Sequence, residues 1–140
     1  MSAMSEKRYT RVFVYGTLMS GERNHGLLGK CALVGEGRTA PYYELVSLEN
    51  YPGMVRGGRT SVLGEVYDVD SATLWLMDQL EGHPHYYQRG LVSTDWGELV
   101  QAYLLPALEV EGLPRIHDGD WRRASRETLQ RLSSPEACRE

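Results

Sequence analysis

Glu81 is the residue of this sequence best suited to acid–base chemistry. A helix is predicted to follow Asp70 or Ser71 and to end at Gly82. At 100° per residue, Glu81 projects within about 20° of Leu74, on the flank of the helix's apolar stripe. Apolar surroundings and the negative end of the helix dipole both disfavour a carboxylate there, so the pKa of Glu81 should exceed the usual value of about 4.3. A general base that works near neutral pH requires such a shift.

Position alone leaves a second interpretation of Glu81 open. Glutamates at helix ends are most often solvated, and Glu81 could reach Arg89 or water from the surface. Asp78 lies about 60° around the helix from Glu81 and is expected on the wetter side. A surface role and a chemical role therefore both fit the sequence.

The loop Tyr15-Gly16-Thr17-Leu18 is the second feature with chemical potential. It ends an apolar, β-favouring run over residues 12–15, which predicts a buried strand that opens into a turn. Successive backbone N–H groups in such a turn bind carboxylate or carbonyl oxygens, and Gly16 permits close approach by a ligand. The pattern also fits an ordinary strand-to-turn connection. It is not a phosphate loop, because Gly-x-x-x-x-Gly-Lys and Gly-x-Gly-x-x-Gly are both missing.

Histidines, serines and cysteines give weaker signals. His83 and His85 are separated by Pro84, and the chain has neither His-Glu-x-x-His nor Cys-x-x-Cys, which disfavours a metal site. The Gly-x-Ser-x-Gly motif of a nucleophile elbow is missing too. Cys31 lacks a recognisable activating context and is expected in the core or in a strand.

Short strands and turns must position these residues. Many short strands, one firm helix with Leu74, Met77 and Leu80 as its apolar positions, and frequent Gly/Pro turns predict an α+β fold with a curled antiparallel or mixed sheet. Trp121 is expected to anchor the C-terminal segment. The predicted strands cover residues 12–15, 32–34, 42–47, 62–69, 88–94 and 99–105, with turns at 51–53 and 57–58 and a second helix near 125–132.

Length and charge narrow the function classes. The 140 residues predict one domain, with a flexible leader over residues 1–10 and a tail over about 133–140. A net charge of -4 without a dense basic cluster argues against nucleic acid as a partner. No apolar run approaches the roughly 18 to 20 residues of a membrane span. Two cysteines, Cys31 and Cys138, form no disulfide framework, so a cytoplasmic location is expected; oligomeric state leaves no signal.

Several short motifs, in order from about residue 11 to 123, resemble the γ-glutamylcyclotransferase-like superfamily. Residues 12–18 with Asn24 are similar to its opening signature, and residues 63–70 to its central strand. Asp78-Gln79-Leu80-Glu81-Gly82-His83-Pro84 with Tyr87-Gln88-Arg89 is similar to its catalytic block, and 101–103 and 119–122 match weaker later signatures. The short chain and the Tyr-Gly-Thr-Leu form resemble most the γ-glutamylamine cyclotransferase branch, which includes the plant avirulence-induced proteins.

The resemblance implies a small mixed or antiparallel β-barrel flanked by a few short helices. It implies Glu81 as the catalytic residue, and substrate binding by the loop Tyr15, Gly16, Thr17 and Leu18. Tyr87 and Tyr103 carry over as two further substrate-binding residues.

The implied reaction is intramolecular. The α-amine of a γ-glutamyl amine or peptide attacks its own γ-carbonyl, and 5-oxoproline and a free amine are released. Glu81 acts as general acid and base, and no metal or other cofactor is needed. Two alternatives remain: a hydrolase in which Glu81 activates water, and a non-catalytic γ-glutamyl-binding module. Residues 19–23 and 42–59 are expected to shape the side of the pocket that receives the released amine.

Overall fold

The computed structural model describes residues 8–132 of the chain. This part contains a seven-stranded sheet, two α-helices and two short 3-10 helices. The strands are β1 (Tyr9–Val14), β2 (Ala32–Arg38), β3 (Tyr43–Ser47), β4 (Pro52–Arg56), β5 (Leu63–Asp70), β6 (Gln88–Ser93) and β7 (Leu99–Leu104). The helices are η1 (His25–Leu28), α2 (Ser71–Glu81), η2 (Ala107–Val110) and α3 (Trp121–Leu132).

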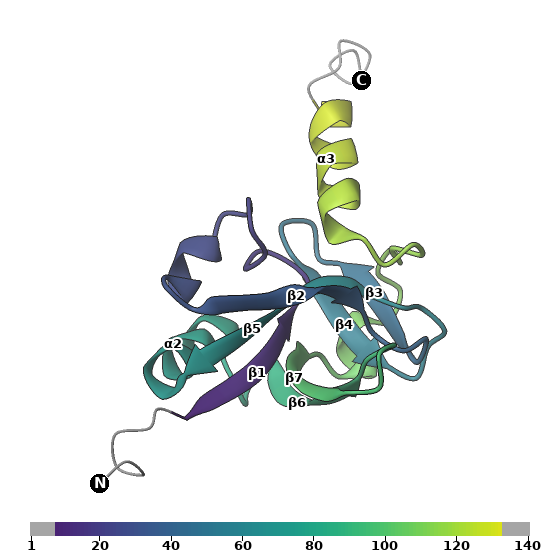
Figure 1. The fold of residues 1–140 in the computed structure, drawn as a ribbon. Coiled ribbons are helices and arrows are strands. Elements are labelled where there is room, and N and C mark those ends of the chain that lie inside the picture. Colours follow the sequence, from purple (N-terminus) through teal and green to yellow (C-terminus); the bar gives the residue numbers. More distant parts are fainter. Residues whose placement is uncertain (1–7, 133–140) are drawn as a thin grey trace, which may run out of the picture.

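The strands form one mixed sheet in the order β2-β5-β1-β7-β4-β3, with β6 paired to β7 beside this path (Figure 1). β1 pairs antiparallel with β5 and parallel with β7. The end of β2 approaches the end of β6 through a single bridge between Thr39 and Thr94. The predicted α+β class with a mixed sheet is confirmed. The sheet is curled, but its ladders do not close into a complete barrel within residues 8–132.

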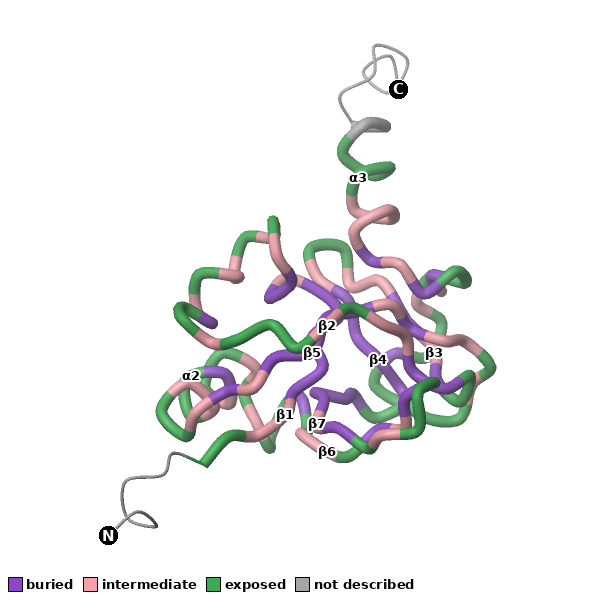
Figure 2. The backbone as a smooth tube through the Cα atoms, in the orientation of Figure 1, coloured by how far each residue is buried: buried purple, intermediate pink, exposed green. Residues whose placement is uncertain are grey.

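The central strand β1 leads directly into the loop Tyr15–Leu18. Val12, Phe13 and Val14 are all buried, because sheet neighbours and covering elements leave neither face of the strand in water (Figure 2). A strand buried on both faces needs a continuous apolar run rather than an alternating one. This requirement explains the Val-Phe-Val sequence that leads directly into the loop at Tyr15.

Local signals fix both ends of α2. Asp70 caps its first turn by accepting a hydrogen bond from the Thr73 amide at 2.8 Å. Gly82 ends it in the left-handed conformation, with φ 67°, which a glycine adopts without steric cost. The end at Gly82 was predicted, and Asp70 is one of the two N-caps, Asp70 or Ser71, that were predicted. Glu81 is thus the last residue of the helix.

Residues 51–53 were predicted as a turn, and this prediction is wrong. Pro52 is instead the first residue of β4, which pairs antiparallel with β3. The actual turn covers residues 48–51 and holds Glu49 at φ 73°. Proline is tolerated at the first position of a strand, where its missing N–H removes no essential ladder bond. The Tyr-Pro-Gly sequence therefore marks the end of a turn and not its centre.

The first strand and the last helix both begin earlier in the sequence than predicted. Tyr9 and Thr10 belong to β1 and not to a leader; residues 1–7 lie outside the described part. Helix α3 begins at Trp121 and not near 125, because Asp120 accepts a hydrogen bond from the Arg123 amide in the manner of a helix cap. The Trp121 side chain is buried in the core, as predicted, while α3 projects away from the sheet (Figure 1). The predicted tail and Cys138 fall outside the described residues.

None of the helices within residues 8–132 has the length and apolarity needed to cross a membrane.

Candidate active site

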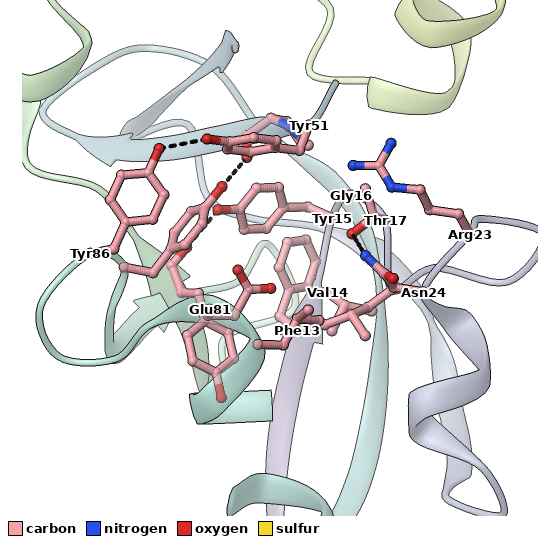
Figure 3. Close-up of a pocket in the computed structure, with 15 residues that line it drawn as sticks. Phe13, Val14, Tyr15, Gly16, Thr17, Arg23, Asn24, Tyr51, Glu81 and Tyr86 are labelled. Atoms are coloured by element: carbon pink, nitrogen blue, oxygen red, sulfur yellow. Dashed lines mark hydrogen bonds between the residues drawn. The ribbon is translucent and has the colours of Figure 1, made fainter. Parts of the chain in front are cut away.

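A cavity of about 290 Å³ lies between the end of β1, the end of α2 and the beginning of β4 (Figure 3). This volume is at the small end for ligand sites and suits a molecule of amino-acid size. All seven residues predicted for the site from the sequence line this one cavity. The complete lining is Phe13, Val14, Tyr15, Gly16, Thr17, Leu18, Arg23, Asn24, Tyr51, Pro52, Leu80, Glu81, Tyr86, Tyr87 and Tyr103.

Glu81 extends its carboxylate into this cavity from the last position of α2 (Figure 3). Its side chain receives no hydrogen bond and forms no ion pair with any described residue. Burial raises its pKa to about 7, because the charged form loses water and gains no compensating donor. A carboxylate that changes protonation state near neutral pH can both accept and return a proton.

Asp78, one turn before Glu81 on α2, has a different environment. Its carboxylate accepts hydrogen bonds from Arg89 at 2.9 and 3.1 Å and from the Tyr103 hydroxyl at 2.6 Å. Burial alone would raise the pKa of Asp78, but the bonds from Arg89 and Tyr103 outweigh burial and lower it. Asp78 was predicted on the wetter side of the helix, and this prediction is wrong: its side chain is only 17% exposed. Because Arg89 forms its ion pair with Asp78, the alternative in which Glu81 pairs with Arg89 is also wrong.

The loop that follows β1 is held rigidly at the floor of the cavity. The Tyr15 hydroxyl donates to the Tyr103 carbonyl at 2.6 Å and accepts from the Met54 amide at 3.1 Å. Thr17 receives two hydrogen bonds of 2.9 Å from Asn24, one from the amide to the Thr17 carbonyl and one from the side chain to the Thr17 hydroxyl. The amides of Gly16, Thr17 and Leu18 donate to no acceptor among the described residues. Three consecutive donors thus remain beside the cavity.

Gly16 is required for packing as well as for ligand approach. A Cβ at this position would lie 2.6 Å from Cγ of Pro52, at the start of β4. The proline ring is itself held, because its carbonyl accepts the Tyr87 hydroxyl at 2.6 Å. Glycine therefore lets the loop lie directly against β4, and a larger residue here would disturb stability together with binding.

Tyrosines form one wall of the cavity, and the hydroxyls of all five that line it are already bonded. Tyr87 donates to Pro52, while Tyr51 and Tyr86 share a hydrogen bond of 2.8 Å at the mouth. Burial and the bond to Tyr51 raise the pKa of Tyr86 to about 12, and burial raises the pKa values of Tyr15, Tyr87 and Tyr103 further. Tyr15, Tyr86, Tyr87 and Tyr103 are therefore neutral near pH 7.

A second glutamate, Glu65 on β5, supports the loop from outside the cavity. Its buried carboxylate accepts hydrogen bonds from the Ser20 amide at 2.7 Å, the Ser20 hydroxyl at 2.6 Å and the Tyr67 hydroxyl at 3.0 Å. Arg122 from α3 lies 3.6 Å away. Burial would raise the pKa of Glu65, but the donors from Ser20 and Tyr67, with Arg122, lower it. The segment after Leu18 is thereby fixed to the sheet.

The sequence interpretation missed the contributions of Glu65 and Tyr86. The segments 19–23 and 42–59 were expected to shape the pocket, and Arg23, Tyr51 and Pro52 from them line the cavity. Glu65 was read only as one position of the strand predicted over residues 62–69. One signal was present: Glu65 is the sole acid in the buried stretch of β5 from Gly64 to Tyr67. Buried acids are rare unless they have partners, so this position predicted a hydrogen-bond network.

Histidines near the cavity have structural partners. The His83 ring accepts a hydrogen bond through Nδ1 from the Arg89 amide at 3.0 Å. The His25 ring lies 2.9 Å from the Leu18 carbonyl through its Nδ1. Across residues 8–132, no group of three or more His, Cys, Asp or Glu side chains has an arrangement that could hold a metal ion.

Comparison with known proteins identifies the family. The profile of the family described as "Gamma-glutamyl cyclotransferase, AIG2-like" matches residues 12–123. The chain belongs to this family. The match covers both the loop after β1 and Glu81.

Relatives in other organisms agree with this assignment. A Vibrio cholerae protein is 44% identical over 111 residues, which is 79% of this chain and 93% of the relative. That protein is named provisionally as a γ-glutamylcyclotransferase. The γ-glutamylcyclotransferase family protein YtfP of Escherichia coli is 39% identical over 112 residues, 79% of this chain and 95% of YtfP. The crystal structure of a uropathogenic E. coli-specific protein has a TM-score of 0.72 at 29% identity, covering 84% of this chain and 95% of that one.

Proposed function

We propose that this member of the γ-glutamylcyclotransferase family is an enzyme of the γ-glutamylamine cyclotransferase type. It converts a γ-glutamyl amine or peptide into 5-oxoproline and a free amine. The observation that carries the proposal is the pairing within one small cavity of an unpartnered carboxylate, Glu81, and the unpaired loop amides of residues 16–18. The first can move a proton near pH 7, and the second can hold the oxygens of a glutamyl group.

Glu81 handles the protons in this reaction. The α-ammonium of the substrate transfers one proton to the Glu81 carboxylate, and the neutral nitrogen attacks the γ-carbonyl carbon. Protonated Glu81 then gives its proton to the leaving nitrogen, and the bond between the γ-carbon and that nitrogen breaks. The ring nitrogen loses its remaining extra proton through Glu81 to the departing amine or to water. A pKa of about 7 suits both transfers, because neither protonation state is strongly favoured.

The loop and the tyrosines hold the substrate in the bent conformation that cyclisation requires. Amides of Gly16, Thr17 and Leu18 bind the glutamyl oxygens, and the Tyr15 ring supports them from below. Tyr87 and Tyr103 provide a rigid wall, because their hydroxyls are bonded to Pro52 and Asp78. Holding the amine and the carbonyl in attack geometry lowers the barrier by several kcal/mol in well-oriented intramolecular reactions.

The direct test is incubation of the purified protein with a panel of γ-glutamyl amines and γ-glutamyl dipeptides. Mass spectrometry would follow 5-oxoproline, free glutamate and the released amine together. Equal amounts of 5-oxoproline and amine are expected. Free glutamate in place of 5-oxoproline would identify a hydrolase, and binding of the panel without any turnover would identify a binding module.

A further inference from the structure

We propose that Asp78 is a positioning residue for Glu81: it binds Arg89 and thereby keeps that guanidinium away from the Glu81 carboxylate. This inference rests on the proposed cyclotransferase function and adds a residue to it. Both acids lie on α2, three residues apart. Side chains with this spacing are neighbours on a helix surface, with about 5 to 6 Å between their Cβ atoms. A long donor side chain that reaches Asp78 could therefore contact Glu81 instead.

Asp78 holds Arg89 through both oxygens of its carboxylate. Nε of Arg89 donates to Oδ1 at 2.9 Å, and Nη2 donates to Oδ2 at 3.1 Å. The exposed fractions of the side chains are 22% for Arg89 and 17% for Asp78, so water and salt screen the pair weakly. Two parallel bonds between a guanidinium and a carboxylate fix direction as well as distance. The guanidinium is thus directed at Asp78 and makes no bond to Glu81.

Neighbouring contacts hold this ion pair in place. The Tyr103 hydroxyl, from the residue opposite Arg89 on β7, donates to Oδ1 of Asp78 at 2.6 Å. The Arg89 amide donates to Nδ1 of His83 at 3.0 Å, and the His83 amide donates to the Asp78 carbonyl at 2.9 Å. The last turn of α2 is therefore tied to β6 and β7 through Asp78, while Glu81 faces the cavity (Figure 3).

Other groups near the end of α2 do not supply the donor that Arg89 withholds from Glu81. The titratable and charged side chains of the elements packed there are Tyr15, Arg23, Tyr51, Asp78, His83, Tyr86, Tyr87, Arg89, Tyr103 and Glu109. The hydroxyls of the tyrosines are all bonded elsewhere, and Arg23 forms no ion pair with any described residue. Burial is consequently the cause that raises the pKa of Glu81 to about 7.

Release of Arg89 would turn Glu81 from a base into half of an ion pair. A positive charge within about 4 to 6 Å lowers the pKa of a carboxylate by about 1 to 3. Such a carboxylate accepts a proton from an ammonium less readily near neutral pH. The two acids in one turn of α2 thus divide two tasks: Asp78 binds the cation, and Glu81 stays without a partner.

The test replaces Asp78 by the nearly isosteric amide in Asp78→Asn and records the pH dependence of kcat/KM for 5-oxoproline formation. The amide offers Arg89 no charge, so the guanidinium should turn to Glu81. The midpoint near pH 7 should then fall by about 1 to 3 pH units. Adding Arg89→Gln to Asp78→Asn should return the midpoint to near pH 7. Asp78→Ser also removes the charge, makes the same prediction, and serves if the amide disturbs the fold.

A merely structural role of Asp78 predicts a different result. Stability and kcat would then fall in Asp78→Asn while the midpoint stayed near pH 7, and an unchanged midpoint would overturn the proposal. A midpoint that stays low in the double variant would overturn it too, because Arg89 would not be the donor that reaches Glu81.

Asp68→Asn is the matched control. Asp68 on β5 binds Arg11 through both oxygens, at 3.0 and 3.2 Å, and lies outside the cavity lining. The same change from carboxylate to amide should leave the midpoint there at the wild-type value. An equal shift in Asp68→Asn would assign the effect to the lost charge in general and overturn the proposal.

A titration that needs no turnover separates this proposal from the proposed function. Carbon-13 NMR of labelled glutamate carboxyl groups follows the protonation of Glu81, and the signal that disappears in Glu81→Gln identifies it. The midpoint should lie near pH 7 in the wild type, lower in Asp78→Asn, and near pH 7 again in the double variant. This series in a protein that forms no 5-oxoproline would reject the proposed function and still support positioning by Asp78. Equal midpoints in the wild type and Asp78→Asn would overturn the positioning, whatever product is formed.

Discussion

Two glutamates flank the loop that follows β1, and their environments are opposite. Glu65 lies behind the loop and accepts three hydrogen bonds from Ser20 and Tyr67, with Arg122 nearby. Glu81 lies in front of the loop and accepts none from the described residues. Burial by itself raises the pKa of both side chains, but partners reverse the shift for Glu65 only, whereas the pKa of Glu81 rises to about 7.

This difference shows that burial alone does not determine what a buried acid does. A carboxylate that is surrounded by donors remains charged and stabilises the fold. A carboxylate that lacks donors is destabilised in its charged form and can exchange a proton with a ligand instead. Glu65 thus supports the loop, and Glu81 is available for chemistry. The predictions below test this contrast.

Glu81→Gln should give the largest effect. The substitution keeps the size of the side chain and removes its ability to accept a proton, so kcat should fall at least about 100-fold. The rate of 5-oxoproline release measures the change, and circular dichroism checks the fold. Glu111→Gln, at an exposed position outside the cavity, is the control with the same chemical change. Turnover within about tenfold of the wild type would remove Glu81 from the role of base.

The pH profile of the wild type should reflect the raised pKa of Glu81. Because the base must be unprotonated, kcat/KM should fall about tenfold per pH unit below a midpoint near pH 7. An ordinary, solvated glutamate would place this midpoint near 4.5. Initial rates between pH 5 and 8 on a substrate whose own groups do not titrate in that range distinguish the two cases.

Glu65→Gln should affect stability and substrate affinity more than the chemical step. The amide cannot accept all of the bonds from Ser20 and Tyr67, so the free energy of unfolding should fall by about 2 to 3 kcal/mol at pH 7. A shifted Ser20 would move the loop and raise KM.

Glu36→Gln is the control for Glu65→Gln. Glu36 also contacts Arg122, at 3.2 Å, but its side chain is 59% exposed, so its loss should cost less than about 0.5 kcal/mol in urea unfolding. The pKa of Glu65 is lowered on folding, so its stabilisation is present above the ordinary pKa and is lost as the pH falls through the folded value. The cost of Glu65→Gln should shrink in acid. A cost that is independent of pH would contradict the assigned charge.

Glu81→Gln should have the opposite effect on stability. Since the pKa of Glu81 rises from 4.5 to about 7 on folding, the protonated acid is fully favourable below pH 4.5, and this advantage is lost as the pH rises through 7. The neutral amide avoids the cost of burying a charge. The free energy of unfolding of the variant should therefore exceed that of the wild type by about 1 to 3 kcal/mol at pH 8 and equal it at pH 4. A variant that is less stable than the wild type at pH 8 would contradict the unpartnered state of Glu81.

Removal of metals should have the smallest effect. The nucleophile in the proposed reaction is the amine of the substrate, and Glu81 supplies the proton transfers, so no metal-bound hydroxide is required. After dialysis against a strong chelator, kcat should stay within about twofold of its initial value. Loss of activity that added zinc restores would favour a metal-assisted hydrolase.

The local features of the site were predictable from the sequence. Asp70 and Gly82 mark the ends of α2, and the apolar spacing of the helix places Glu81 on a flank, because caps and periodicity act over a few residues. The apolar run before Tyr15 likewise predicted a buried strand that opens into a loop. The strands Gln88–Ser93 and Leu99–Leu104, which pair as a hairpin, were predicted as segments 88–94 and 99–105, almost to the residue.

Partnerships between distant residues were not predictable in this way. The sequence contains both Asp78 and Arg89, but only the folded structure shows that Arg89 binds Asp78 and that Glu81 has no partner among the described residues. Glu65 and Ser20 are 45 residues apart, and Arg122 follows Ser20 by 102 residues. Pro52 was taken for a turn because its role at the start of β4 depends on pairing with β3.

The sequence by itself therefore indicated the candidate site residues, and it predicted the helix and the strand end that carry most of them. Only the tertiary structure decided which acid has hydrogen-bond donors around it and which has none among the described residues. The reason is physical: the pKa of a carboxylate depends on the donors and the solvent within a few ångströms of it, and in a curled mixed sheet those neighbours come from segments far apart in the chain.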